Sequence, residues 1–335
     1  MATQEIILPG KYLGHMLEVW DVDRTGTHLD FPAANGVYQV SLTLGGAAGA
    51  DVAQVLAFPG RRMLGGIQLA PGEKKTYVFA LDVRFSRVQL LVEGANPAVA
   101  DFKMKKADQI PTIFLLGDST VCDQEQSPYH AGWGELLPVL FDENVNVSNH
   151  ARCGYSTQSF IRDQLFLTIM DRIKPGDVLM MQFAHNDQKE TTDRYAPAYG
   201  SFTHTLRYFI KIARETGATP VLVTSQPRRR FDEDGHIVHT LGDYPEAMRK
   251  LAQSDDVALI DLNQKATALL EAYGPEESKK LFAYVAPGVT ELFPEGNVDD
   301  THFSYEGALK MAGLVLEGMQ ELGLDICKYI RRSQQ

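Results

Sequence analysis

Two short polar segments carry residue types that together can attack an acyl group. Ser119 directly follows a Gly-Asp pair at the end of an apolar run. Asp299 lies three residues before His302, so its carboxylate can curl back onto imidazole Nδ1 and leave Nε2 free to act as a base. A hydroxyl beside such a base is a nucleophile toward an ester carbonyl. The spacing therefore predicts Ser119 as nucleophile, His302 as base and Asp299 as the orienting acid.

Two further segments supply hydrogen-bond donors. Gly154 lies in a loop after the run 144–149, and without a Cβ its backbone N–H can point freely at a ligand. Asn186 lies in a His-Asn-Asp run that follows the apolar stretch 177–183, and its amide can donate to a developing negative charge. With the N–H of Ser119, these groups predict an oxyanion hole.

Each segment has an ordinary structural alternative when it is taken alone. Ser119 can be a turn or cap residue, Gly154 a loop glycine, and Asn186 the start of an Asx-turn. His302 can be exposed beside a helix cap, and Asp300 competes with Asp299 as the partner of its imidazole. The combination, in which each segment follows a strand or precedes the last helix, favours a catalytic site.

The second part of the chain alternates buried-looking strands with amphipathic helices. Continuous apolar strands between helices predict a parallel sheet covered on both faces, with its ligand site beyond the carboxyl ends of the strands. The expected strands are 112–117, 144–149, 177–183, 220–225 and 257–262, and the clearest helices are 205–215 and 304–322.

The first part of the chain has a different pattern. Runs at 38–44, 75–81 and 88–92 are short and apolar or alternating, and they are separated by Gly and Pro turn signals, which predicts an antiparallel sandwich or barrel. The charged stretch 101–108 is expected to be a linker. We therefore expect a β-sandwich-like accessory domain over 1–107 and a catalytic domain over 108–335.

The order of these segments resembles the SGNH (or GDSL) hydrolases over about 110–325. Within that superfamily the wording around 116–120, 131–134, 149–160 and 185–187 resembles the rhamnogalacturonan acetylesterases. The resemblance implies a three-layer α/β/α, flavodoxin-like domain that removes acetyl groups from pectic polysaccharide through a Ser-His-Asp acyl-enzyme, without a metal or cofactor.

The chain departs from the minimal members of that family in two ways. Ala184 stands where the family usually has glycine, although Asn186 is kept. The β-rich first hundred residues are an addition. An extra β domain of this kind in a carbohydrate enzyme resembles a carbohydrate-binding or cleft-completing domain.

Three residues near the site are candidate substrate contacts. Trp133 can stack on a sugar, Arg152 can meet a uronate carboxylate, and His185 can lie on the substrate side. The alternatives are a core tryptophan, a solvated arginine and a structural histidine. Cys153 is expected to be a small buried packing residue, and the arginine run 228–230 either recruits an acidic polymer at the cleft rim or is a solvated loop.

Composition limits the partners. The 335 residues are 44% hydrophobic and 22% charged with a net charge of −11, which argues against non-specific nucleic-acid binding and against attraction to anionic membranes. The three cysteines have no metal-ligand spacing and are expected to be free thiols. With no basic leader and no long apolar run, we expect a cytoplasmic protein that acts on acetylated oligosaccharides.

The residues leave other functions open. The same site would serve a deacetylase of xylan or another glycan, or a general short-chain esterase, and acyl transfer to a sugar is also compatible. A lipase is disfavoured because no apolar lid-like segment lies near the motifs. A protein of another class, a non-catalytic sugar binder, is disfavoured by the intact Ser119, Asp299 and His302.

Overall fold

The computed structural model describes residues 5–7, 26–124 and 129–331. The chain divides into two compact units. The first, here called the β unit, consists of Met1–Pro111, Leu136–Ser148 and Lys328–Gln335. The second, the α/β unit, consists of Thr112–Glu135 and Asn149–Cys327. The β unit thus takes in two later segments that the sequence assigned to the catalytic part.

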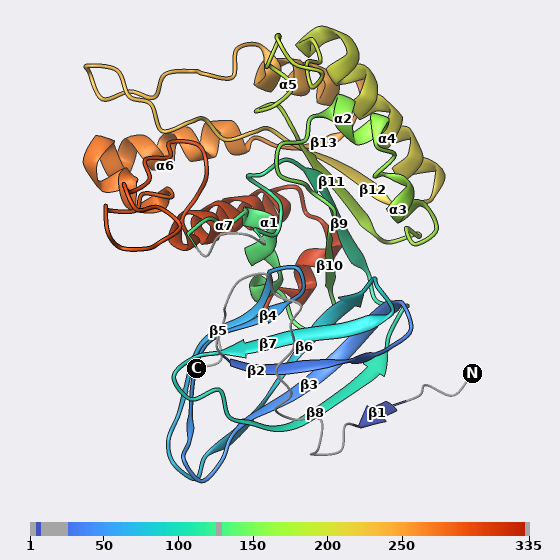
Figure 1. Ribbon diagram of the computed structural model, residues 1–335. Coiled ribbons are helices and arrows are strands. Elements are labelled where there is room, and N and C mark those ends of the chain that lie inside the picture. The colour runs from blue at the N-terminus through green and yellow to red at the C-terminus, as the bar shows by residue number, and fades with distance from the viewer. Residues whose placement is uncertain (1–4, 8–25, 125–128, 332–335) are drawn as a thin grey trace. The chain divides into compact units, whose positions relative to one another are not determined.

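The β unit contains two four-stranded sheets with the strand orders β1-β8-β3-β6 and β2-β7-β4-β5 (Figure 1). All of the pairings described are antiparallel. The strands are β1 (Glu5–Ile7), β2 (Gly26–Pro32), β3 (Gly36–Gly45), β4 (Ala50–Ala57), β5 (Arg61–Leu69), β6 (Lys74–Val83), β7 (Arg87–Glu93) and β8 (Val99–Lys106).

Side chains from both sheets form one core, as the alternating pattern predicts. In β3, Val40, Leu42 and Leu44 are at most 1% exposed, and the residues between them are half-buried. They join buried residues of β2, β4, β6 and β7 in a single apolar cluster. The β unit is therefore a sandwich whose two sheets cover each other's apolar face.

The expected linker at 101–108 is wrong. Most of it lies in β8, where Phe102 and Met104 are buried while the charged residues between them point away from the core. The segment is an amphipathic strand. Its charged residues indicated a linker, but every second residue of such a strand faces solvent and can be charged.

The α/β unit is organised by the strands β9, β11, β12 and β13 of a five-stranded sheet with the order β10-β9-β11-β12-β13. Counted along the chain, this order is second-first-third-fourth-fifth, the flavodoxin-like arrangement, and the pairings β9-β11, β11-β12 and β12-β13 are parallel. The predicted fold class is confirmed. The strands are β9 (Thr112–Gly117), β10 (Asn146–Asn149), β11 (Val178–Gln182), β12 (Thr219–Val223) and β13 (Ala258–Ile260).

Helices cover both faces of this sheet (Figure 1). Residues of α2, α4 and α5 share one apolar cluster with the strands, while α6 packs on α7 and α7 on β13. The α-helices are α1 (Trp133–Leu136), α2 (Thr157–Arg162), α3 (Leu167–Met170), α4 (Thr203–Glu215), α5 (Tyr244–Asp255), α6 (Leu262–Glu277) and α7 (Tyr305–Glu321). The 3₁₀ segments are η2 (Leu137–Leu140), η4 (Ser278–Leu281) and η5 (Asp325–Tyr329), and η3 (Ala198–Phe202) is a π turn.

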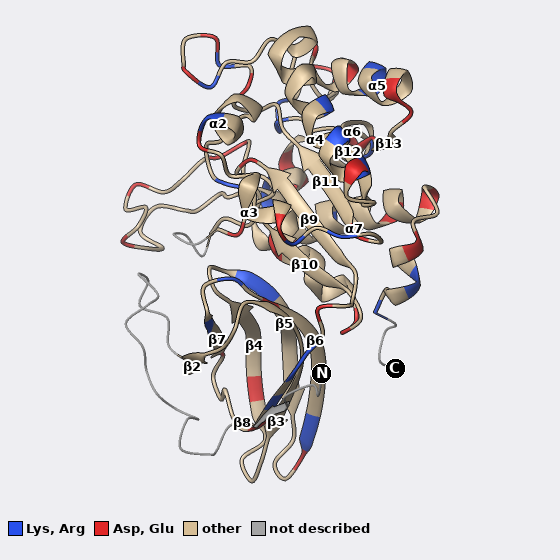
Figure 2. Cartoon of the chain, turned by 90° about the vertical axis from the view of Figure 1, so that its right-hand side faces the viewer, with Lys and Arg blue, Asp and Glu red and all other residues tan. Residues whose placement is uncertain are grey.

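Positively and negatively charged residues are interspersed along helices such as α5, where Arg249 and Lys250 each pair with Glu246 (Figure 2). In the described part of the chain no helix has the length and apolar character needed to span a lipid bilayer.

Candidate active site

Ser119 lies in a tight turn at the carboxyl end of β9. The Asp118 carboxylate accepts hydrogen bonds from the backbone N–H and the hydroxyl of Thr120, at 2.9 and 2.8 Å. The Asp118 carbonyl accepts from the N–H groups of Val121 and Cys122. These bonds turn the chain sharply after the strand and hold the Ser119 hydroxyl at its end.

A hydrogen-bonded relay links Ser119 to a histidine 183 positions later. Ser119 Oγ is 2.8 Å from His302 Nε2. His302 Nδ1 is 2.7 Å from Asp299 Oδ2, and Asp299 Oδ1 accepts from the backbone N–H groups of Thr301 and His302. Asp299 is therefore held by its own loop with one oxygen aimed at the imidazole, as the three-residue spacing predicts.

The competing carboxylate has other partners. Asp300 Oδ1 accepts from Arg229 Nε and from the Tyr284 hydroxyl, each at 2.6 Å. The partner of His302 in the structure is therefore Asp299. Arg229 is one of the three arginines in the run 228–230 that follows β12. Because it pairs with Asp300, it is not a solvated loop residue.

The surroundings perturb the pKa values of the relay. Burial opposes ionisation of Asp299, but the imidazoles of His130 and His302 outweigh it and hold the pKa of Asp299 well below its usual range. Burial also disfavours the charged form of His302, yet the hydrogen bond and the charge of Asp299 raise the pKa of His302 above its ordinary value. The carboxylate thus stays charged and stabilises an imidazolium beside it.

His130 is a neighbour of this pair that the motifs did not single out for a role. Its Nε2 is 3.7 Å from Asp299 Oδ2, and its ring meets the His302 ring edge-on with centroids 5.7 Å apart. Within the described residues, His130, Asp299 and His302 form a cluster whose ligand atoms lie within 4.8 Å of one another. A cation bound by all three would take the Asp299 oxygen away from His302.

The segment 131–134 braces the nucleophile turn against the histidine loop. The N–H of Ala131 donates to the carbonyl of Phe303, and the N–H of Trp133 donates to the carbonyl of Thr120, each at 3.0 Å. A Cβ on Gly132 would lie 2.2 Å from the Cys122 carbonyl oxygen, so only glycine permits this approach. Ser119 and His302 therefore meet through a short connecting segment that contacts both sides.

The expected oxyanion donors belong to the nucleophile turn, the loop of Gly154 and the turn after β11. The N–H groups of Ser119 and Gly154 have no acceptor among the described residues. Gly154 has a φ of 79°, the left-handed region that glycine adopts without strain. The Asn186 amide donates to the carbonyl of Tyr155, beside Gly154, at 3.0 Å, which leaves its second N–H for another acceptor.

Lys189 orients the asparagine and was missed by the sequence analysis. Its Nζ is 2.7 Å from Asn186 Oδ1, so the amide oxygen faces the ammonium group and the amide nitrogen faces the Gly154 loop. No motif marks this lysine, because its role depends on the turn after β11. In that turn Ala184 adopts a φ of 155°, at the position where a glycine was expected.

Two candidate substrate contacts are corrected. Trp133 is 1% exposed and its indole N–H donates to Gln182 Oε1 at 2.8 Å, so it belongs to the core. His185 is 3% exposed, and its Nδ1 is 3.3 Å from Asp118 Oδ2, which makes it a structural residue beneath the nucleophile turn. In both cases the structural alternative holds, since these side chains point into the unit.

Two residues beside Gly154 are exposed. Arg152 remains a candidate substrate contact, with its backbone N–H donating to the carbonyl of Gly117 at 3.0 Å. Cys153 is exposed, so the expectation of a buried packing residue is wrong. Its loop leaves the sheet before the left-handed turn at Gly154, and both side chains that precede the turn reach solvent.

Further cationic side chains surround the site. Arg194 Nη1 lies 3.7 Å from the position that a Cβ on Gly154 would take. Burial lowers the pKa of Lys189, and the nearby charges of Arg194 and Arg228 lower it further. Burial likewise lowers the pKa of Arg228, against the charges of Asp118 and Asp299. We call Arg152, Lys189, Arg194 and Arg228 the cationic rim.

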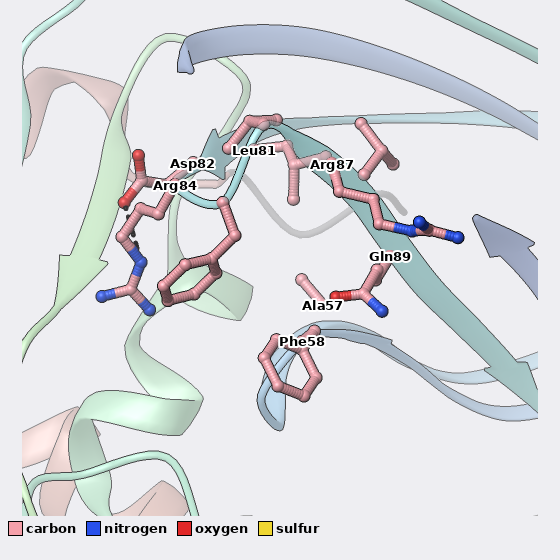
Figure 3. A pocket seen from close by; sticks show the side chains of 10 residues that line it. Ala57, Phe58, Leu81, Asp82, Arg84, Arg87 and Gln89 are labelled. Carbon is pink, nitrogen blue, oxygen red and sulfur yellow. Dashed lines mark ion pairs between the residues drawn. The ribbon is translucent and has the colours of Figure 1, made fainter. Parts of the chain in front are cut away.

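Each unit also contains a separate hollow. In the α/β unit a cavity of about 280 Å³ lies beyond β12 and β13, and Thr240 in its wall contacts Arg228 of the cationic rim. In the β unit Phe58 and Phe85 line a hollow beside the Asp82–Arg84 ion pair (Figure 3). That hollow holds about 20 Å³, room for about one water and not for a sugar ring.

Residues 115–308 match the GDSL-like Lipase/Acylhydrolase family. Rhamnogalacturonan acetylesterase RhgT of Bacillus subtilis is 50% identical over 225 residues, which are 67% of this chain and 94% of that protein. Probable rhamnogalacturonan acetylesterase YesY of the same organism is 36% identical over 219 residues, covering 65% of this chain and 96% of its own length.

One solved structure extends the likeness to both units. The crystal structure of Bacillus subtilis YxiM has a TM-score of 0.60 at 25% identity, covering 96% of this chain and 91% of that one. The β unit is thus part of a shared architecture. On the family match and the identity to RhgT, the chain belongs to the GDSL-like lipase/acylhydrolase family and is a carboxylic ester hydrolase.

Proposed function

We propose that the protein is an acetylesterase that removes O-acetyl groups from pectic, rhamnogalacturonan-type oligo- or polysaccharides through a Ser-His-Asp acyl-enzyme. The relay from Ser119 Oγ through His302 to Asp299, with contacts of 2.8 and 2.7 Å, carries the proposal of a serine nucleophile. The 50% identity to RhgT supports the choice of substrate.

Acylation begins at Ser119. Its Oγ attacks the acetyl carbonyl carbon while His302 Nε2 takes the hydroxyl proton, and the charged Asp299 stabilises the imidazolium that forms. The tetrahedral intermediate then collapses, and the C–O bond to the sugar breaks. The sugar alcohol leaves with the proton from His302.

The oxyanion of this intermediate is held by three donors. They are the backbone N–H groups of Ser119 and Gly154 and the second amide hydrogen of Asn186, whose other hydrogen is engaged by Tyr155. Lys189 adds to this hole by fixing the amide orientation. Such donors are already in place before charge develops, so they lower the barrier without reorganisation.

Deacylation repeats the sequence with water. His302, neutral again after its proton has left with the alcohol, takes a proton from a water molecule that attacks the acetyl-Ser119 carbonyl. Collapse of the second intermediate releases acetate and returns the proton to Ser119. The reaction is hydrolysis when water attacks the acyl-enzyme, and acyl transfer when a sugar hydroxyl attacks it instead.

The cationic rim supports an acidic polymer over neutral xylan. Rhamnogalacturonan carries a uronate carboxylate. Arg194 places positive charge beside Gly154, and the charges of Arg194 and Arg228 also act on Lys189, in a protein whose net charge is −11. Local cations attract an anionic ligand even when the whole molecule is acidic, because screening limits the reach of distant charges to about 10 Å. A neutral xylan gains nothing from them.

The division of labour between the domains is also part of the proposal. The residues of the relay and of the oxyanion hole all lie in the α/β unit, which supports a catalytic role for the part of 108–335 that forms this unit and an accessory role for 1–107. The three cysteines are free thiols, as in proteins of a reducing compartment, which supports the cytoplasm as the site of action. Fractionation of the producing cells tests that location.

Acetate release from a panel of substrates tests the proposal. The panel contains acetylated rhamnogalacturonan oligosaccharides, acetylated xylo-oligosaccharides and an aryl acetate, each with wild type and Ser119→Ala. We expect the highest kcat/KM on the rhamnogalacturonan fragments and loss of all three activities in Ser119→Ala. A preference for xylan fragments would contradict the substrate, and sugar binding without acetate release would contradict the activity.

The role of the cationic rim has its own variant. Arg194→Gln should lower kcat/KM for the uronate substrate by a larger factor than for the aryl acetate. The matched control is Arg207→Gln, which removes an arginine that pairs with Asp255 on the surface of α4. Equal losses on both substrates in Arg194→Gln would show that Arg194 does not read the uronate charge.

A further inference from the structure

Two of the three cysteines lie against each other beside the proposed active site. Cys122 Sγ and Cys153 Sγ are 3.1 Å apart, although 31 positions separate them in the chain. Cys122 comes three residues after Ser119, and Cys153 immediately precedes Gly154. The pair therefore spans the nucleophile turn and the loop of a proposed oxyanion donor, and the proposed mechanism uses neither thiol.

The two thiols have different surroundings. Cys122 is 2% exposed, whereas Cys153 is exposed. The hydrogen bond with Cys122 lowers the pKa of Cys153, and the nearby His302 also favours the thiolate. The same hydrogen bond and burial raise the pKa of Cys122. An accessible thiol with a lowered pKa beside a second thiol is the usual arrangement of a reactive and a resolving cysteine.

We propose that Cys122 and Cys153 form a thiol-modification site that a hydroperoxide converts into an intramolecular disulfide, with reversible loss of esterase activity. The Cys153 thiolate attacks one peroxide oxygen, the O–O bond breaks, and the leaving oxygen takes a proton as alcohol or water. Cys122 then attacks the sulfenic sulfur, the S–O bond breaks, and a second oxygen leaves as water. The two thiols lose two electrons, which reduce the peroxide.

Closing the disulfide moves one side of the site. A disulfide has an S–S distance of about 2.05 Å, so the sulfurs must approach by about 1 Å. Cys122 is held by its N–H bond to the Asp118 carbonyl and by the close approach of Gly132 to its own carbonyl. The exposed loop of Cys153 and Gly154 therefore takes up the movement, and the Gly154 N–H shifts relative to Ser119.

A displaced oxyanion donor lowers turnover. A misplacement of about 1 Å can cost roughly 10²-fold in rate. This effect on activity rests on the proposed role of Gly154, whereas formation of the disulfide rests only on the geometry of the two thiols. Reduction by a dithiol reverses both, because it breaks only the bond between Cys122 and Cys153.

The test treats the full chain with hydrogen peroxide and follows thiols and turnover separately. Wild type, Cys153→Ser and Cys327→Ser are each alkylated before and after treatment, peptides are mapped by mass spectrometry, and turnover of an aryl acetate is measured. Cys327 is the matched control, a partly buried cysteine in η5 with a different neighbourhood.

We expect a Cys122–Cys153 cross-linked peptide in wild type and in Cys327→Ser, with turnover lowered at least about tenfold and restored by dithiothreitol. After peroxide treatment, Cys153→Ser should retain the turnover that it has before treatment. If Cys153→Ser does not fold, Cys122→Ser is used in its place. A wild type that keeps all its thiols overturns the proposal, as does a disulfide without loss of turnover, or equal inactivation of Cys153→Ser. An untreated wild type without turnover would instead contradict the proposed function.

Discussion

At the residue scale, the charge of Asp299 decides when His302 can act as a base. The imidazole must be neutral to accept the Ser119 proton. Because the pKa of His302 is raised, activity is lost on acidification at a pH higher than the ordinary histidine value of 6.5. The strongly lowered pKa of Asp299 keeps this carboxylate ionised across that range. The acid limb of the rate profile therefore reports His302.

Asp299→Asn tests this assignment. It removes the hydrogen bond and the charge that raise the pKa of His302, so burial remains and the acid limb of kcat/KM moves to lower pH. Turnover itself should fall by about 10⁴ because the imidazole loses its preferred tautomer. The pH profiles of wild type, Asp299→Asn and Asp300→Asn check both effects. A larger loss in Asp300→Asn would show that Asp300 is the functional carboxylate.

The Asn186–Lys189 contact gives a second prediction at this scale. Asn186→Ala should lower kcat by about 10²–10³ with normal folding, since one oxyanion donor is lost. Lys189→Met should lower kcat by a smaller factor, because the amide remains but is free to turn. Lys211→Met, on the outer face of α4, is the matched control and should leave kcat unchanged. Unchanged kcat in Asn186→Ala would contradict the proposed oxyanion hole.

The triad candidates could be found from the sequence because their chemistry is local. Asp299 and His302 are three residues apart, and Ser119 follows a strand. Lys189 and His130 could not be found in this way, since each acts through a partner that only the folded chain places beside it. The exposure of Cys153 depended on the direction of a loop that no pattern encodes.

At the element scale, the segment 131–134 connects the two halves of the relay. Its glycines permit backbone contacts that any side chain would prevent, as shown by the 2.2 Å between a Cβ on Gly132 and the Cys122 carbonyl oxygen. The segment holds the nucleophile turn and the histidine loop through backbone hydrogen bonds. A defect here should therefore affect both stability and turnover.

Gly132→Ala should lower the melting temperature and kcat together, since the backbone of the nucleophile turn must move to admit the methyl group. Gly313→Ala is the matched control in α7, where an added Cβ meets nothing within 4 Å. There the helix gains about 0.5–1 kcal/mol in the free energy of unfolding. Thermal unfolding and aryl acetate turnover check both variants, and a Gly132→Ala protein as stable as wild type would contradict the bracing role.

Strands and helices with a clear hydrophobic period could be predicted from the sequence. The strands of the parallel sheet and the stripe of α4 are where the apolar runs place them. The sequence did not predict β8, because the charged residues beside Phe102 and Met104 made the segment resemble a solvated linker. Local composition is a poor guide when half of a strand faces solvent.

At the scale of the whole molecule, a buried carboxyl group makes stability depend on pH. Burial raises the pKa of Asp187 to about 7, against hydrogen bonds from Thr157. The native state therefore holds a proton that the unfolded chain loses near pH 4, so this group's contribution to stability falls as pH rises from about 4 to about 7. The lowered pKa of Asp299 acts in the opposite sense, and its contribution is lost as pH falls.

Asp187→Asn should gain stability relative to wild type as pH rises from about 5 to about 7, by at most about 1.4 kcal/mol per pH unit. Thr157→Val removes a hydrogen bond that favours the charged form of Asp187, so the pKa of Asp187 should rise further in this variant. The loss of stability with rising pH should therefore continue to a higher pH than in wild type. Unfolding by denaturant at several pH values measures the differences. A constant difference between wild type and Asp187→Asn would contradict the raised pKa.

The sequence could not predict which later segments of the chain belong to the β unit. Leu136–Ser148 and Lys328–Gln335 belong to the β unit, where the N–H of Asp142 donates to the carbonyl of Tyr329 and Arg61 Nη1 binds the carbonyl of Val147. These contacts join residues far apart in the chain. Single-residue patterns predict each element but not which distant segment completes a core.

The central claim is that Ser119 carries the acetyl group during turnover. Brief reaction of wild type with an aryl acetate, an acid quench and peptide mapping by mass spectrometry test it most directly. We predict a single acetyl group on Ser119, absent from Ser119→Ala together with the turnover. An acetyl group on the neighbouring Cys153, or undiminished acetate release by Ser119→Ala, would contradict it.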